Sequence, residues 1–107
     1  MNINIENTLQ QMLATMQQTC GEQWKVAKPV LEGMLKRKEA RLKSLTDDLL
    51  KKEITQEDYK SFLEDEKLLM EAELQATQVI AKATAQKAIN AAMEVLQQAA
   101  STALKSL

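Results

Sequence analysis

The chain is poor in the residues that build and punctuate β-structure. Its 107 residues include only two glycines, one proline and three aromatic side chains. Strands need turns rich in glycine and proline and runs of β-branched or aromatic residues, so a β-sheet fold is disfavoured. Residues 79–104 instead read VIAKATAQKAINAAMEVLQQAASTAL, without a glycine or a proline. We therefore predict an all-α protein that forms one helical domain over residues 1–107.

Histidine is absent, and Cys20 is the only cysteine. The lack of histidine removes the commonest general base and the commonest ligand for transition metals. A single cysteine excludes an intrachain disulfide. Cys20 falls on an apolar stripe between Met16 and Trp24, which favours a buried thiol over a reactive one. We expect no catalytic residue, no metal and no cofactor, and hence a protein that is not an enzyme.

Long apolar runs and a large excess of one charge are also missing. No run approaches the roughly 18 apolar residues of a membrane-spanning helix, and the first residues lack the basic and apolar regions of a signal peptide. Fourteen basic residues stand against 15 acidic ones, so nucleic acid is not an expected partner. The basic run at 36–43 lacks aromatic residues and contains Glu39. We expect a cytoplasmic protein, while export without a signal peptide stays open.

Apolar residues recur every three or four positions in the first half of the chain, as one face of a helix requires. They predict a helical arm over about residues 5–52 and are Leu9, Leu13, Met16, Cys20, Trp24, Ala27, Leu31, Met34, Leu42, Leu45 and Leu49. Gly21 and Pro29 interrupt this arm, and a proline removes one backbone hydrogen bond. We predict a kink or a split within residues 20–29. The alternative is one helix over about 5–20 and another over about 29–52.

A turn is predicted at about residues 52–55, near the middle of the chain. Thr55 is a good helix N-cap, and Asp58 follows three residues later, at the position of a capping box. A second arm follows over about residues 55–104. Two arms of similar length predict a long antiparallel hairpin with coiled-coil packing, each arm about 70 Å long at about 1.5 Å per residue.

Charge predicts the register of this hairpin. Basic residues dominate residues 36–52, whereas residues 53–73 hold eight acids and two lysines. If the chain turns near residue 53, the numbers of facing positions sum to a constant value. Lys38 and Arg41 then lie near Glu66. Such exposed pairs fix register more than they add stability.

The alanine-rich end of the second arm has a very wide apolar face. On a helical wheel its apolar residues spread over roughly 220°, about twice the stripe of an ordinary surface helix. A two-arm hairpin offers this face only one partner helix. We therefore predict that a second copy covers the rest, in a dimeric four-helix bundle or a larger homo-oligomer. The expected interface residues are Trp24, Ala85, Ala88, Ile89, Ala92, Met93 and Leu96.

Clustered carboxylates are the remaining candidates for chemistry. They are Glu64, Asp65, Glu66, Glu71 and Glu73 on the second arm, with Glu32 and Glu39 on the first. Di-iron bundles need a Glu-x-x-His motif, and no EF-hand spacing is present. We interpret these acids as a solvated or salt-bridged face.

No motif in the sequence names a biochemical function. The leading hypothesis is a non-enzymatic interaction or scaffold protein that works as a homo-oligomer. One alternative is an exported helical-hairpin subunit of a filament, needle or pore. The other is an inhibitor or adaptor of a mobile element that binds a partner protein.

Overall fold

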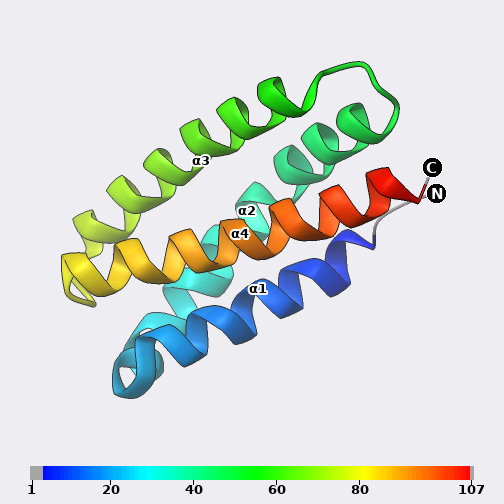
Figure 1. Ribbon diagram of the computed structural model, residues 1–107. Coiled ribbons are helices and arrows are strands. Elements are labelled where there is room, and N and C mark those ends of the chain that lie inside the picture. The colour runs from blue at the N-terminus through cyan, green and yellow to red at the C-terminus, as the bar shows by residue number, and fades with distance from the viewer. Residues whose placement is uncertain (1–3, 107) are drawn as a thin grey trace.

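The computed structural model describes residues 4–106, and these residues form four α-helices and no strand. The helices are α1 (Ile5–Cys20), α2 (Trp24–Leu50), α3 (Gln56–Thr77) and α4 (Lys82–Lys105), with a 3-10 turn, η1 (Gly21–Gln23), between α1 and α2. Successive helices run antiparallel, and α4 returns beside α1, so α1 begins and α4 ends at the same end of the bundle (Figure 1). The prediction of an all-α, bundle-like fold is confirmed.

The first arm is split at Gly21. This residue has φ 57° and ψ −123°, a combination that residues with a side chain rarely adopt. A Cβ atom added here would meet nothing within 4 Å, so the backbone conformation, and not lack of space, requires glycine. The Gly21 N–H donates to the Gln17 carbonyl and closes α1. The predicted split within residues 20–29 is confirmed.

Pro29 does not start a helix, contrary to the alternative that placed a helix start at about residue 29. α2 already begins at Trp24 and continues through Pro29 to Leu50. The proline removes the donor for only one helical carbonyl, that of Lys25. The remaining turns of this long helix keep their hydrogen bonds, so one missing bond does not end it.

The turn between α2 and α3 forms where the sequence predicts it. The Thr55 side chain accepts a hydrogen bond from the Asp58 N–H at 3.0 Å, and the Asp58 carboxylate accepts one from the Thr55 N–H at 3.3 Å. This reciprocal pair is a capping box, and it fixes the start of α3. Lys52 completes the reversal with a positive φ of 62°.

The second arm is also broken, which corrects the continuous helix expected over about residues 55–104. α3 ends at Thr77, and Gln78 caps it in the left-handed conformation with φ 56°. α4 starts at Lys82 and runs antiparallel to α3 (Figure 1). No glycine or proline marks this break.

Both arms are therefore folded in half at the same level of the hairpin. The described residues measure 40 × 22 × 19 Å along their principal axes, so arms of about 70 Å do not occur. The physical reason is burial. A straight hairpin leaves most of the apolar face of α4 in water, whereas folding back covers that face within one chain.

α4 is the central helix of the bundle. It packs against all three other helices, and most extensively against α1. Its fully buried alanines, Ala85, Ala88, Ala92 and Ala100, share one core with large α1 side chains such as Met12 and Met16. Small side chains on one helix let a neighbour with large side chains approach closely.

Ion pairs between α2 and α3 confirm the predicted register. Lys38 Nζ donates to Glu66 Oε2 at 2.8 Å, and Arg41 Nε donates to Glu66 Oε1 at 3.1 Å. Further along, Arg37 pairs with Glu73. These contacts lie between antiparallel neighbours, as the charge pattern indicates.

Candidate interaction surfaces

Six of the seven residues predicted to form an interface lie in α4 and are buried inside the single chain. Ala85, Ala88, Ile89, Ala92 and Leu96 are 0% exposed and Met93 is 2% exposed. The folded arms supply the extra helices from the same chain, so the alanine face does not need the predicted second copy to cover it. The seventh residue, Trp24, is half-buried at the start of α2 and lines a groove.

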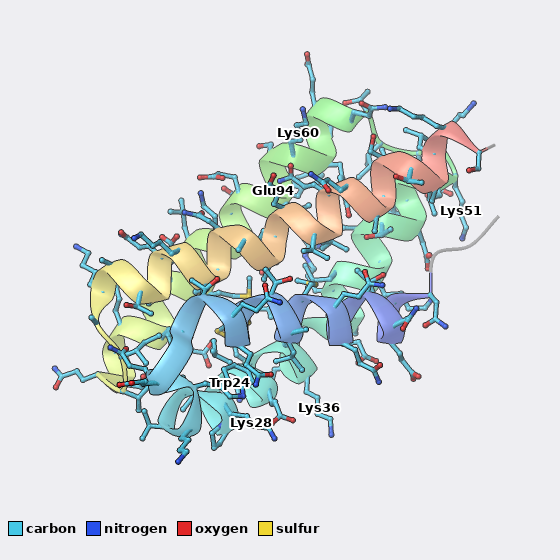
Figure 2. The ribbon with its side chains drawn as sticks, turned by 60° about the horizontal axis from the view of Figure 1, so that its bottom comes forward. Trp24, Lys28, Lys36, Lys51, Lys60 and Glu94 are labelled. Atoms are coloured by element: carbon cyan, nitrogen blue, oxygen red, sulfur yellow. The ribbon has the colours of Figure 1, made fainter. Side chains whose placement is uncertain are left out.

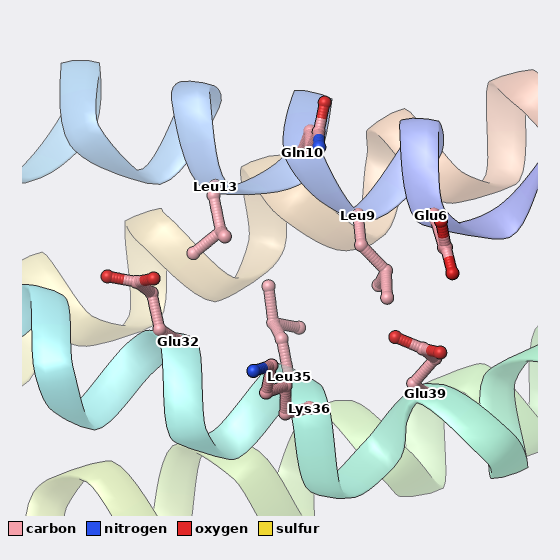
Figure 3. Close-up of a pocket in the computed structure, with 8 residues that line it drawn as sticks. All are labelled: Glu6, Leu9, Gln10, Leu13, Glu32, Leu35, Lys36 and Glu39. Carbon is pink, nitrogen blue, oxygen red and sulfur yellow. The ribbon is translucent and has the colours of Figure 1, made fainter.

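This groove runs between α1 and α2 and consists of two adjoining hollows. The first, of about 260 Å³, is lined by Glu6, Leu9, Gln10, Leu13, Glu32, Leu35, Lys36 and Glu39. Figure 3 shows leucines of both helices pointing toward one another as its floor, with Glu6 and Glu39 at one end. The second hollow, of about 310 Å³, shares Gln10, Leu13 and Glu32 and reaches Trp24.

The charges around the α1–α2 groove are mixed. Trp24, Lys28 and Lys36 lie along the same stretch of α2 (Figure 2). Lys28 pairs with Glu32 on the next turn of the helix, at 3.9 Å. Positive and negative side chains alternate along the rim of the groove. The charge of the rim therefore favours neither a mainly acidic nor a mainly basic partner.

The outer face of α3 is a second candidate surface, and sequence reasoning missed it. We define it as Phe62, Asp65, Leu68, Leu69, Ala72 and Ala76, all of which are exposed. Leu68 and Leu69 are 53% and 57% exposed, and Phe62 is 36% exposed. α3 packs only against α2 and α4, so this face has no neighbour among the described residues.

A signal for this face was present in the sequence. Phe62 is followed by Leu63, and Leu69 by Met70, and adjacent helical residues point about 100° apart. One member of each pair therefore faces the core while the other faces away. Leu63 and Met70 are buried, at 1% and 0% exposure, and Phe62 and Leu69 are the members left outside.

Some acids of α3 form ion pairs and others do not. Glu66 is buried at the α2 side with Lys38 and Arg41. Burial alone would raise the pKa of Glu66, but hydrogen bonds and charge attraction from the two cations outweigh it and hold the pKa below its ordinary value. Asp58 and Asp65, in contrast, are exposed and make no ion pair with any residue that the structure describes.

The thiol of Cys20 is buried, as predicted. Burial raises its pKa, so the reactive thiolate is disfavoured. Within residues 4–106, no three histidine, cysteine, aspartate or glutamate side chains gather as metal ligands would. Nor is any helix in that part of the chain long and apolar enough to span a membrane.

No protein-family model, curated protein or solved structure matches this chain.

Proposed function

We propose that this chain is a non-enzymatic interaction protein that binds its partner through the outer face of α3. One observation carries the proposal: Phe62, Leu68 and Leu69 are exposed on a helix whose opposite side already fills the core. Clustered exposed apolar side chains cost solubility, and on soluble proteins they mark contact sites. The remaining surface of α3 is polar, as the rim of such a site is.

A photo-crosslinking amino acid in place of Leu69 tests this proposal in cells that express the full chain. The matched control places the same amino acid at Val26, which is similarly exposed, at 56%, but lies on α2. We expect a discrete crosslinked product from position 69 and none from position 26. The absence of any product at position 69, or identical products from both positions, would contradict the proposal.

A second candidate function is that of a scaffold that works as a homo-oligomer. It is supported by the matching breaks at Gly21–Gln23 and at Gln78–Ala81, which lie at the same end of the bundle (Figure 1). If both breaks straighten, α1 stays paired with α4 and α2 stays paired with α3 within one chain. The contacts of α1 with α2 and of α3 with α4 are then remade between two copies, in the manner of domain swapping.

Molar mass measured by light scattering over a range of concentrations tests the second candidate. Gly21→Ala places a side chain at a conformation that L-residues disfavour, which favours the straight arm. We expect a larger dimeric fraction in this variant than in the unaltered chain. A Gly21→Ala chain that folds and stays monomeric at every concentration would reject exchange of the arms.

A further inference from the structure

We propose that the partner on the outer face of α3 is a basic amphipathic helix of another protein. This inference rests on the function proposed above and specifies the chemistry of the partner.

The spacing is that of a helix-pairing seam. Phe62, Asp65, Leu69, Ala72 and Ala76 are separated by three, four, three and four residues, the repeat of the two contact positions in a coiled coil. All five are exposed. They span about 21 Å of helix at about 1.5 Å per residue. Leu68 flanks the seam beside Leu69 and widens its apolar part.

The size and charge of the seam side chains differ between the two ends of the seam. Ala72 and Ala76 are small, so a partner helix can approach closely at the C-terminal half of α3. Towards the N-terminal half, Phe62 stands between two acids, Asp58 and Asp65, which are seven residues apart. The partner therefore needs apolar residues against Phe62 and Leu69 and a cation against each acid.

All the charge on this side of α3 is negative. On a helical wheel Glu73, the partner of Arg37, falls beside the seam, whereas Glu57 and Glu64 lie about 100–120° from its centre. The lysines of α3, Lys60 and Lys67, fall on the opposite side, toward α4. Lys67 is mostly buried and pairs with Glu64 at 3.0 Å. The seam acids thus face solvent without a cation from the described part of the chain, so a partner with lysine or arginine seven residues apart complements them.

A second copy of the chain does not supply such a helix. Most of the exposed basic residues in the helices lie on α2, namely Lys25, Lys28, Lys36, Arg37, Arg41 and Lys43. The only exposed large apolar side chain of α2 is Val26, which lies between Lys25 and Lys28. Without leucines at seam spacing, that surface offers charge but no apolar match for Phe62 and Leu69.

Binding of two labelled synthetic peptides to the full chain tests the inference. The basic peptide is an amphipathic helix with leucine at the seam positions and lysine at two positions seven residues apart. The acidic peptide is identical except for glutamate at those two positions. Fluorescence anisotropy gives the affinity of each peptide, and circular dichroism verifies that every protein variant is folded.

We expect the basic peptide to bind and the acidic peptide not to bind. Leu69→Gln should weaken binding about tenfold or more, as loss of an interface hot spot does. Asp65→Lys should weaken binding of the basic peptide by a similar factor and allow the acidic peptide to bind. Val26→Gln, the matched change of an equally exposed apolar residue, should leave both affinities unchanged.

Three results would overturn the inference: equal binding of the two peptides, equal weakening by Val26→Gln and Leu69→Gln, or no binding of the basic peptide. A crosslink from position 69 to a second copy of the chain would also overturn it. That last result leaves the proposed function intact, because the face would still be the interaction surface. An absent crosslink at position 69 would remove the proposed function itself.

Discussion

Glu66 is buried between α2 and α3, where its two carboxylate oxygens accept hydrogen bonds from Lys38 and Arg41. Although burial opposes ionisation, the two cations hold its pKa below the value of an unfolded chain. A carboxyl group whose pKa falls on folding stabilises the protein at pH values above its unfolded pKa. That stabilisation is lost as the pH falls through the folded pKa.

Glu66→Gln should lower the free energy of unfolding near neutral pH by about 1–3 kcal/mol, because it leaves two cations facing a neutral group. The deficit should shrink at acidic pH, as the pH falls through the lowered pKa of the native carboxyl group and that group is itself protonated. Urea unfolding at the two pH values measures both effects. Glu94→Gln, at an exposed acid on α4, is the control and should change little. An equal deficit at both pH values would contradict this account.

Single residues with a strong local signal could be predicted from the sequence. The burial of Cys20, the capping box at Thr55 and the pairing of Lys38 with Glu66 each follow from spacing or charge. The exposure of Leu69 was missed, since a leucine in a helical pattern is normally assigned to the core. Its position relative to Met70 shows that both cannot face the same side.

At the scale of elements, the two breaks differ in how they are encoded. The break at Gly21 can be predicted from the sequence, because only glycine readily adopts the backbone conformation found there. Gln78 adopts the left-handed conformation beside the β-branched residues Thr77, Val79 and Ile80, at a local cost of about 1–2 kcal/mol. That cost is small beside the burial of the α4 face, so tertiary packing decides the break. The β-branched residues lower helix propensity only slightly and do not mark a break as glycine or proline would.

Gln78→Gly should raise the free energy of unfolding by about 0.5–1 kcal/mol, because glycine removes the strain of the left-handed conformation but adds freedom to the unfolded chain. Thermal or urea unfolding gives the change. The matched control is Gln17→Gly, at an exposed helical position in α1. This substitution should lower the free energy of unfolding by about 1 kcal/mol. Destabilisation by both substitutions would mean that Gln78 makes contacts that outweigh its strain.

At the scale of the whole molecule, the predicted pairing of facing residues is compatible with two different shapes. In a straight hairpin and in the folded bundle alike, α2 lies beside α3 and α1 lies beside α4, each pair antiparallel. Charge and size patterns along the arms therefore predict which helices pair and not whether the hairpin is folded in half. The width of the alanine face correctly predicts several neighbouring helices, but those neighbours come from the same chain.

Ala88→Leu tests whether the alanine face holds the whole bundle together. Ala88 is 0% exposed on the helix that contacts all three others, so a larger side chain must displace a neighbouring helix. We expect overpacking to lower the free energy of unfolding by about 1–3 kcal/mol. Urea unfolding should still show one cooperative transition, with its midpoint at a lower urea concentration. Ala83→Leu adds the same atoms at an exposed position of α4. It should change the free energy of unfolding by no more than about 0.5 kcal/mol. If the two variants are equally stable, α1 and α4 are not packed closely through alanine, and the reason for the folded arms has to be sought in other contacts.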